Sequence, residues 1–523
     1  MKDLQAQQVL VLGLGQSGLA MARWCLRHGA RVTVADTRES APQRAALQAD
    51  CPQADFVAGP FDDSLLARAR WTLIARSPGL APAQLQTVFD WARAHSVSVV
   101  TELDLFAQAL VELAQQPAQP YRPQVLAITG TNGKTTVTSL TGLLLRCAGL
   151  RVALAGNIGP NLLDVLSAAQ AAQPAALPEV WVLELSSFQL DGTANGAWGQ
   201  IPTAAALLNL SEDHLDWHGS QAAYTQAKAA VFGQQALMVL NRDDARVMAL
   251  QPAMQTVKVG ARKQQQAARA FLTFGLDQPH RAGDWGIEAA RGMDWLVRAQ
   301  AQQQTRPNGR LQEGTAALEL QRLMPVQALR IRGRHNAANA LAALALASST
   351  GAALGPMLHG LREYRGEPHR VEPVAIVNQV EYFDDSKGTN VGATLAAVRG
   401  LGAERRLVVI LGGDGKGQNF QALADALAHH ARAVLLIGRD AALIRSQLTQ
   451  ALEQAQIPLF DADSLPAAVR LAAQQAHAGD AVLLSPACAS LDMFDNYVHR
   501  ARVFVQAVTE LAAAQGQALE GAP

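Results

Sequence analysis

Gly130-Thr131-Asn132-Gly133-Lys134-Thr135-Thr136 follows an apolar run at 125–128 and precedes a second one at 137–145. This order predicts a strand, a glycine-rich turn and a helix. Backbone N–H groups in such a turn can surround phosphate oxygens, Lys134 can reach the outer phosphates, and Thr135 can bind Mg²⁺. The turn is shorter than the usual P-loop, because only two residues separate Gly130 from Gly133. We therefore predict an ATP-using enzyme from a subset of P-loop proteins.

Lysine is scarce in this chain, which has seven lysines among its 44 lysine and arginine residues. Arginine therefore supplies most of the positive charge. A lysine kept in such a background suits tasks that a guanidinium cannot perform, such as acting as a compact charge on phosphate or reacting at nitrogen. Four of the seven lie in polar or glycine-rich motifs: Lys134, Lys228, Lys387 and Lys416.

The composition is that of an ordinary globular protein, with 523 residues, of which 49% are hydrophobic and 17% charged. This length predicts two to four domains. The formal net charge is zero, so we expect small-molecule partners rather than nucleic acid or a membrane surface. The four cysteines are far apart, which is typical of a protein in a reducing cytoplasm. No segment has the roughly 20 consecutive apolar residues of a membrane span.

Strands and helices alternate along most of the chain, which predicts an α/β fold. Residues 1–101 carry a βαβ pattern and are expected to form a domain with a parallel sheet. The P-loop belongs to a second domain at 102–366, in which the polar stretch 298–314 is expected to be a surface loop. Apolar strands separated by Ala/Leu-rich helices predict a third α/β domain at 367–523.

A second glycine-rich turn, Gly13-Leu14-Gly15-Gln16-Ser17-Gly18, also lies between a predicted strand and a predicted helix. Asp36 ends the next strand, at the position where a dinucleotide-binding enzyme holds ribose, and Arg38 could instead pair with a phosphate. The pattern predicts a site for a nucleotide-type anion without identifying the ligand. Taken alone, it leaves an NAD(P)-dependent enzyme as an alternative.

Polar residues follow two further apolar strands of the second domain. Glu184 ends one of them, and we expect it to bind the same Mg²⁺ as Thr135, because ligands gather at the carboxyl ends of strands in open α/β sheets. His214 lies in the segment 209–216 after another strand, and Lys228 follows it by fourteen residues in a predicted helix. A histidine and acids at a strand end suggest a second metal position.

Nine motifs resemble, in this order, those of one family, the Mur ligases: GTNGKTT, GNIG, ELSSFQL, NLSEDHLD with Lys228, GRHNAANALAA, EPHRVE, DDSKGTN, GGDGKG and SPACASLDMF. The resemblance covers residues 9–505 and implies three α/β domains. The N-terminal one would be Rossmann-like and bind a UDP group, and the central one would be P-loop ATPase-like with a mainly parallel sheet. The C-terminal one would be Rossmann-like, bind the incoming amino acid and close onto the central domain during catalysis.

The pairing of DDSKGTN with SPACASLDMF is most similar to the members that join D-glutamate to UDP-N-acetylmuramoyl-L-alanine. The resemblance then implies a monomeric, cytoplasmic ligase of peptidoglycan precursor synthesis that uses ATP, two Mg²⁺ ions and an acyl phosphate intermediate. In that family the lysine matching Lys228 is carbamoylated and ligates the second Mg²⁺.

The resemblance also assigns site residues. For catalysis it implies Lys134, His214, Lys228 and Lys387, and for the metal ions Thr135, Glu184, His214 and Lys228. For ATP it implies Gly130, Thr131, Asn132, Gly133, Lys134, Thr135, Thr136, Asn336, Asn339, Arg370 and Asp385. For the UDP substrate it implies Gln16, Ser17, Asp36, Thr37, Arg38, Ser77, Gly79, Asn157 and His214. For D-glutamate it implies Thr389, Lys416, Ser490, Leu491 and Tyr497. Gln16-Ser17 and Tyr497 depart from the usual Leu-Thr and Phe of the family.

Related functions remain as alternatives. A folylpolyglutamate synthase would lack the first nucleotide-binding domain. A ligase that adds another amino acid, such as L-glutamate, would use the same catalytic residues. The residues that bind the carboxylates of glutamate do not show whether the D- or the L-enantiomer fits. A non-catalytic UDP-sugar or ATP sensor would be expected to lack some of the catalytic cations, whereas Lys134, Lys228 and Lys387 are all present.

Overall fold

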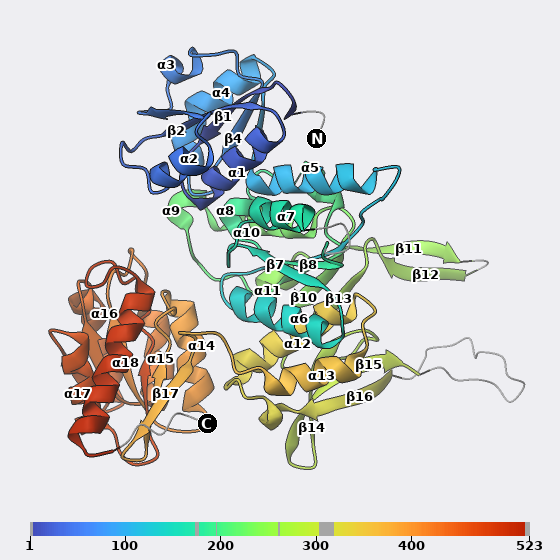
Figure 1. Cartoon of the computed structure of the whole chain (residues 1–523). Coiled ribbons are helices and arrows are strands. Elements are labelled where there is room, and N and C mark those ends of the chain that lie inside the picture. The colour runs from blue at the N-terminus through green and yellow to red at the C-terminus, as the bar shows by residue number, and fades with distance from the viewer. Residues whose placement is uncertain (1–3, 173–176, 195, 260–261, 303–317, 518–523) are drawn as a thin grey trace, which may run out of the picture. The chain divides into compact units, whose positions relative to one another are not determined.

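The computed structural model describes residues 4–172, 177–194, 196–259, 262–302 and 318–517 (Figure 1). Contacts within the chain divide it into two compact units, one of residues 1–324 with 340–361 and the other of residues 325–339 with 362–523. The expected α/β architecture is confirmed, since the first unit holds a five-stranded and a nine-stranded sheet and the second a six-stranded sheet. Among the described residues, no helix has the length and apolar character needed to cross a membrane.

The N-terminal domain has five parallel strands in the order β3-β2-β1-β4-β5. The two central strands are almost fully buried, which suits their uninterrupted apolar sequences. The strands are β1 (Gln8–Leu12), β2 (Arg31–Asp36), β3 (Asp55–Ala58), β4 (Leu73–Arg76) and β5 (Ser98–Val100), and the helices are α1 (Gln16–Arg27), α2 (Arg44–Asp50), α3 (Asp63–Leu66) and α4 (Gln86–Ala94).

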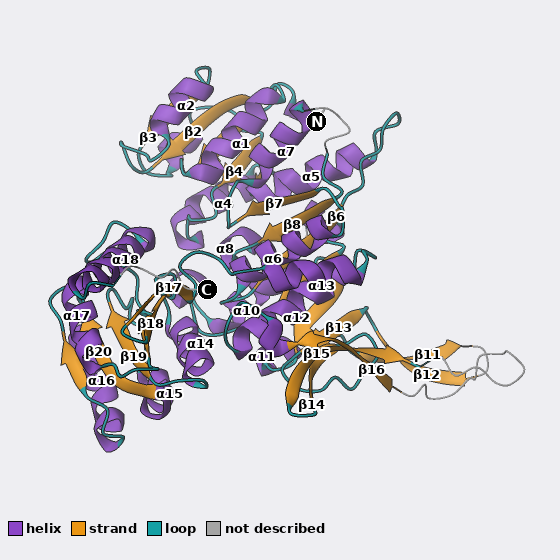
Figure 2. Ribbon diagram, turned by 60° about the horizontal axis from the view of Figure 1, so that its bottom comes forward, coloured by secondary structure: helices purple, strands orange, loops and turns teal. Residues whose placement is uncertain are grey.

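The central domain has nine strands in the order β16-β15-β14-β13-β10-β9-β6-β8-β7. The strands from β7 to β14 in this order are parallel, and β15 is antiparallel to β14. They are β6 (Gln124–Thr129), β7 (Val152–Gly156), β8 (Val180–Glu184), β9 (Ala204–Leu207), β10 (Leu237–Asn241), β13 (Phe271–Phe274), β14 (Trp285–Ala290), β15 (Met293–Ala301) and β16 (Leu318–Pro325). A separate ribbon pairs β11 (Met254–Val259) with β12 (Arg262–Ala267) (Figure 2).

The helices of this part of the chain are α5 (Glu102–Ala114), α6 (Lys134–Cys147), α7 (Leu162–Ala171), α8 (Ser187–Leu190), α9 (Leu215–His218), α10 (Gln221–Ala229), α11 (Ala245–Met248), α12 (Arg334–Ser348) and α13 (Leu354–Glu363). The surface loop expected at 298–314 differs in its first residues, which continue β15 because this strand pairs with β14 through buried Leu296 and Val297. The part at 303–317 lies outside the described residues.

The C-terminal domain is a six-stranded sheet in the order β17-β18-β22-β19-β20-β21, parallel except for the edge strand β17. Separate apolar clusters cover its two faces. The strands are β17 (Glu372–Val377), β18 (Val380–Asp384), β19 (Leu407–Gly412), β20 (Ala431–Ile437), β21 (Leu459–Asp461) and β22 (Ala481–Leu484), and the helices are α14 (Val391–Gly402), α15 (Ala424–His430), α16 (Ala441–Gln454), α17 (Leu465–Gln475) and α18 (Tyr497–Ala514).

Candidate active site

The P-loop turn connects β6 to α6, as its sequence predicts. Gly130 and Gly133 both have positive φ angles, 155° and 83°. A Cβ atom on Gly130 would lie 2.9 Å from the Cβ atom of Leu208, so the turn needs glycine there. Asn209 fixes the turn from the neighbouring strand end, because its Oδ1 accepts the Asn132 N–H at 2.8 Å and its Nδ2 donates to the Asn132 carbonyl at 3.0 Å.

Two lysines meet at one carbonyl oxygen of this turn. Lys134 Nζ donates to the carbonyls of Gly130 and Thr131, both at 2.8 Å, and Lys228 Nζ donates to the same Gly130 carbonyl at 2.8 Å. Lys228 is 2% exposed. Burial, together with repulsion from Lys134, holds the pKa of Lys228 well below its usual range, although Asp213 and Glu184 oppose this effect. The Lys228 side chain is therefore suited to react as a neutral amine.

Glu184 lies at the carboxyl end of β8, as expected, and is 1% exposed. Its Oε1 accepts a hydrogen bond from Asn157 Nδ2 at 2.7 Å. Its Oε2 is buried and has no hydrogen-bond partner within the described part of the chain. A buried carboxylate oxygen without a partner is unfavourable unless a cation or donor is bound. With the buried Thr135 hydroxyl, this oxygen gives the hard donor set that Mg²⁺ prefers, so these residues fit the implied ion.

His214 lies at the edge of this site. It precedes α9 in a left-handed backbone conformation with φ 52°, and its ring centroid is 4.6 Å from that of Phe188. Its Nε2 is 3.6 Å from Asp213 Oδ2, and its side chain is 41% exposed. Asp213 also interacts electrostatically with Lys228, which connects this segment to the lysine pair. The structure thus brings Lys134, Lys228 and Glu184 together, with His214 more exposed beside them.

The glycine-rich turn of the N-terminal domain is held by a buried carboxylate. Asp36 is 2% exposed, and its Oδ2 accepts the Leu14 N–H at 2.7 Å. The Arg38 guanidinium donates to both carboxylate oxygens, at 2.8 and 2.9 Å. Burial opposes ionisation of Asp36, but the hydrogen bonds from Arg38 and Leu14 prevail and lower its pKa to about 2. Thr37, next to this pair, is exposed.

The other residues of this domain that are assigned to the UDP substrate follow β1 and β4. Ser77 follows β4, and its hydroxyl donates to the Gly13 carbonyl at 2.8 Å. Gly18 packs so closely on this turn that a Cβ atom on it would lie 1.9 Å from the Gly13 carbonyl oxygen. Gln16 is exposed, and the position of Gly79 is open. The structure therefore groups the predicted residues of this domain at one edge of its sheet.

In the C-terminal domain, the segment after β18 carries Asp385 and Lys387. Asp385 Oδ2 accepts the Ser485 hydroxyl at 2.6 Å, and burial raises the pKa of Asp385 to about 7 against the opposing effects of Ser485 and Arg370. Lys387 Nζ lies 5.2 Å from the centroid of the Tyr497 ring, a cation–π contact. The structure thus brings Arg370, Asp385, Lys387 and Tyr497 into one group.

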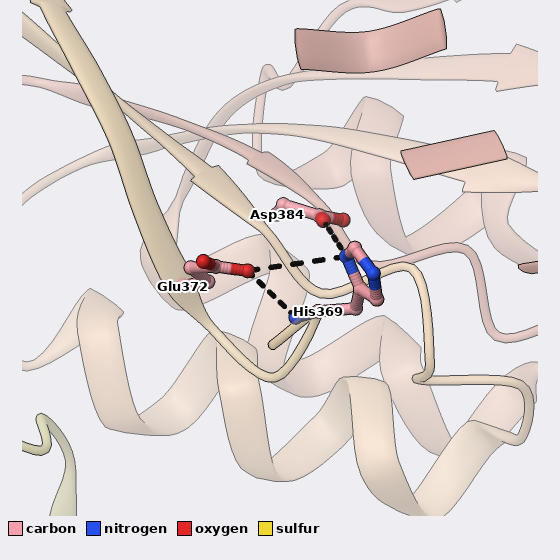
Figure 3. Close-up of side chains that lie close together, drawn as sticks. All are labelled: His369, Glu372 and Asp384. Atoms are coloured by element: carbon pink, nitrogen blue, oxygen red, sulfur yellow. Dashed lines mark hydrogen bonds and ion pairs between the residues drawn. The ribbon is translucent and has the colours of Figure 1, made fainter. Parts of the chain in front are cut away.

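A histidine and two carboxylates next to this segment contact one another (Figure 3). His369 Nδ1 lies 2.7 Å from Asp384 Oδ2 and 3.9 Å from Glu372 Oε2. The His369 N–H also donates to Glu372 Oε2 at 2.8 Å, and the His369 carbonyl accepts the Lys387 N–H at 3.2 Å. Their ligand atoms lie within 4.8 Å of one another, as a metal site would require. The 2.7 Å contact between His369 Nδ1 and Asp384 Oδ2 has the length of a hydrogen bond. Hydrogen bonding therefore accounts for the cluster, which holds the Lys387 segment through the His369 carbonyl.

The residues predicted for glutamate come from adjacent strand ends of this sheet. The loop of Lys416 pairs with that of Ser490, because Asp414 and Ala489 exchange two backbone hydrogen bonds of 3.0 and 2.8 Å. Ser490 is 4% exposed, whereas Leu491 is 71% exposed. Thr389, whose N–H donates to the Lys387 carbonyl, lies in the segment after β18. β18, β22 and β19 are neighbours in the sheet, which explains this grouping.

Asn336 and Asn339 lie in the first turns of α12, as the motif predicts. Asn339 Nδ2 donates to Asn336 Oδ1 at 3.0 Å, and Asn336 Nδ2 donates to the Arg332 carbonyl at 2.8 Å. The two amides therefore form one polar unit at this helix end.

Two residues that shape these sites were not predicted from the sequence. Asn209, described above, stood in a quoted motif but had no role. Arg500 of α18 is fully buried and donates to the Ser386 hydroxyl and carbonyl, at 3.0 and 2.8 Å, and to the Cys488 carbonyl at 3.1 Å. It thereby joins the segments that carry Lys387 and Ser490. A fully buried arginine in an apolar helix gives little sequence signal.

Family models match three consecutive parts of the chain: the Mur ligase MurD-like N-terminal domain at residues 7–101, the Mur ligase middle domain at 128–347, and the Mur ligase glutamate ligase domain at 369–488. Among solved structures, MurF from Acinetobacter baumannii superposes with a TM-score of 0.54 at 17% identity, covering 96% of this chain and 91% of that one. This similarity concerns the fold alone.

Curated relatives match over their full length. The UDP-N-acetylmuramoylalanine–D-glutamate ligase of Albidiferax ferrireducens is 59% identical over 522 residues, which cover 100% of both chains. The enzyme of the same name from Burkholderia ambifaria is 53% identical, covering 98% of this chain and 99% of that one. The family resemblance of the nine sequence motifs is thus confirmed. The chain belongs to the Mur ligase family, within its MurD branch.

Proposed function

We propose that this protein is the ATP-dependent ligase that joins D-glutamate to UDP-N-acetylmuramoyl-L-alanine in peptidoglycan precursor synthesis. One observation carries the chemistry: Lys134 and Lys228 converge on the Gly130 carbonyl, next to Glu184, whose Oε2 has no hydrogen-bond partner within the described ranges. Such a group of cations and a carboxylate on a phosphate-binding turn fits phosphoryl transfer. The names of the full-length relatives support this choice of amino acid and acceptor.

The reaction requires activation of a carboxylate, which is a poor acyl donor. A carboxylate oxygen of the lactoyl-alanine group attacks the γ-phosphorus of ATP, giving an acyl phosphate and ADP. The amine of D-glutamate then attacks the acyl carbon, loses a proton, and phosphate leaves from the tetrahedral intermediate. Lys134 offsets the charge that develops on the transferred phosphoryl group, because an ammonium close to these oxygens favours the transition state.

The proposed metal ligands are Thr135 and Glu184 for one Mg²⁺, and His214 with carbamoylated Lys228 for the other. Bound Mg²⁺ supplies Lewis-acid stabilisation of the phosphate oxygens. Carbamoylation joins the neutral Lys228 amine to CO₂ with loss of a proton. The side chain then ends in an anionic carbamate, whose oxygens can bind a metal ion. The buried, neutral-amine environment of Lys228 supports this modification, because only an unprotonated amine can attack CO₂.

The other ligands are assigned to the remaining residue groups. ATP would contact the P-loop residues, Asn336, Asn339, Arg370 and Asp385, with Lys387 at the γ-phosphate. The UDP substrate would contact the strand-end residues of the N-terminal domain together with Asn157 and His214. D-glutamate would be held by Thr389, Lys416, Ser490, Leu491 and Tyr497, where a lysine opposite a dicarboxylate is electrostatically favourable. We further propose a cytoplasmic location, since the substrates are ATP and a nucleotide-linked precursor, and a monomeric state, as the family resemblance implies.

The test is phosphate release from ATP in the presence of Mg²⁺ and UDP-N-acetylmuramoyl-L-alanine, with D-glutamate, L-glutamate or no amino acid. We expect release with D-glutamate only, together with an equal amount of the dipeptide product. Release with L-glutamate only would keep the mechanism and overturn the amino acid. Absence of release with either glutamate would overturn the proposed function.

A further inference from the structure

The first residue of α5, Glu102, is a buried acid to which no role has yet been given. Its side chain is 3% exposed. Its Oε1 accepts the Leu163 N–H at 3.2 Å, whereas its Oε2 is buried and has no hydrogen-bond partner among the described residues. An acid left with an unpartnered oxygen in the protein interior usually has a purpose beyond packing, because glutamine or an apolar residue would be cheaper to bury.

Glu102 touches both segments that surround the proposed UDP-substrate site of the first unit. The Leu163 N–H at the start of α7 donates to its carboxyl group, and the Ser17 hydroxyl, in the first turn of α1, lies close enough to lower its pKa. The helices α1, α5 and α7 contact one another, and both Figure 1 and Figure 2 show them side by side. One carboxyl group therefore joins the glycine-rich turn of the N-terminal domain to a helix of the central domain.

The start of α7 is itself tied to the catalytic residues. It follows the loop of Asn157, and the Asn157 side chain donates to Glu184 Oε1 at 2.7 Å. Polar contacts thus connect Ser17 to Glu102 and Glu102 to α7, and the loop before α7 carries Asn157, which donates to Glu184. A shift of Glu102 would therefore move the glycine-rich turn at Ser17, which is assigned to the UDP group, relative to Asn157 and Glu184.

The charge on Glu102 is set by its surroundings. Burial raises its pKa to about 7, against the lowering effect of the Ser17 and Leu163 hydrogen bonds. Asp164 of α7 faces it and also favours the neutral form, although Asp164 is paired with Arg23 of α1 at 3.2 Å. On α5 itself, the neighbouring acid Asp104 accepts hydrogen bonds from the N–H and hydroxyl of Thr101.

We propose that Glu102 is a positioning residue, which holds the Ser17 turn against the start of α7 and thereby sets the affinity for the UDP substrate. Ionisation adds a buried charge between the two segments that the donors at Ser17 and Leu163 offset only in part, so binding weakens as Glu102 ionises. This inference rests on the proposed function, because the UDP substrate defines the site that Glu102 supports.

The experiment measures KM for UDP-N-acetylmuramoyl-L-alanine from pH 6 to 9 at saturating ATP and D-glutamate, in the wild type, Glu102→Gln and Glu102→Ala. The diphosphate diester of this substrate has no group that titrates between pH 6 and 8.5. We expect the wild-type KM to rise above pH 7 by up to about tenfold per pH unit, as for a single ionisation that opposes binding. Glu102→Gln should keep the low KM at every pH, while Glu102→Ala should raise KM throughout and change kcat less than about threefold.

Glu112→Gln, on the same helix, is the matched control and should follow the wild-type profile. Glu102→Gln with the wild-type pH dependence, or Glu102→Ala with an unchanged KM, would overturn the proposal. Calorimetric binding of the UDP substrate without ATP or glutamate separates this failure from that of the proposed function. If the wild type binds but does not turn over, the same pH series of dissociation constants tests Glu102 alone. If the wild type does not bind this substrate, both proposals are wrong.

Discussion

The two glycine-rich turns of the first unit occupy equivalent places, each between a buried parallel strand and a helix, yet their partners carry opposite charge. The turn at Gly13–Gly18 meets the carboxylate of Asp36, which already accepts the Leu14 N–H. The turn at Gly130–Thr136 meets two lysines. A backbone N–H that is bonded to the protein's own carboxylate is not available to a pyrophosphate. The charged residues around a turn, rather than its glycines, therefore determine which anion the turn can take.

The largest effect is expected at the lysine pair. Lys228→Arg should lower the rate of phosphate release by about 10³-fold or more. A guanidinium cannot form a carbamate, and it stays charged even when it is buried. Steady-state phosphate release measures this loss, and thermal unfolding reports whether the variant is folded. Lys263→Arg in β12 is the control and should retain activity. More than a tenth of wild-type activity in a folded Lys228→Arg variant would show that the P-loop turn needs only a positive charge.

The glycines of the first turn should differ sharply from each other. A Cβ atom at Gly18 would lie 1.9 Å from the Gly13 carbonyl oxygen, whereas one at Gly15 would meet no atom within 4 Å. We expect Gly18→Ala to lower the free energy of unfolding by about 3 kcal/mol and Gly15→Ala by at most about 1 kcal/mol. Urea denaturation of the pair measures the difference. Equal losses would mean that the turn relaxes around the added methyl group, so that the close contact between Gly18 and the Gly13 carbonyl does not matter for stability.

The Asp36 carboxylate, which holds this turn, should make the stability of the protein depend on pH in the acid range. The pKa of Asp36 lies at about 2 in the folded protein, below its usual value of 3.8. The stabilisation is therefore fully present above the unfolded pKa and is lost as the pH falls towards 2. Asp36→Asn should be less stable than the wild type by about 2 kcal/mol at pH 7, and the gap should close between about pH 4 and 2. A constant gap in urea titrations across this range would contradict the assigned ionisation.

The smallest effect is expected at Arg38, the exposed partner of the same carboxylate. Its side chain is 57% exposed, so solvent screens the pair, and Arg38→Ala should cost less than about 1 kcal/mol of stability at pH 7. Chemical denaturation in low and high salt measures this contribution, which salt should reduce further. A loss as large as that of Asp36→Asn would mean that solvent does not screen the pair of Arg38 and Asp36.

The sequence predicted the parts of the fold that depend on local patterns. The P-loop turn, Glu184 at a strand end and Lys228 in a helix all follow from apolar periodicity and a few glycines, and each has its predicted location. The three α/β domains and the family resemblance are likewise confirmed. The exact domain boundaries and the roles of individual site residues stay predictions.

The contacts that the sequence could not predict join residues far apart in the chain. Arg500 bonds to Ser386, and Glu102 bonds to Leu163, through pairings that no local pattern encodes. The end of β15 was also missed, because polar residues at 298–301 resemble a loop although β15 continues through them. Burial of an arginine or glutamate depends on its final neighbours, so its sequence context resembles that of an exposed residue.

The carbonyl oxygen of Gly130 is shared by two amines, so the P-loop turn binds the protein's own lysines. Moving Lys134 from the carbonyls of Gly130 and Thr131 to a phosphate breaks two hydrogen bonds of about 1 kcal/mol each in net terms. The loss of these two hydrogen bonds therefore reduces the observed affinity for ATP. Once Lys134 has moved away, Lys228 loses a repelling neighbour at the same oxygen. Nucleotide loading and the protonation of the second lysine are therefore thermodynamically linked, so each responds to the other.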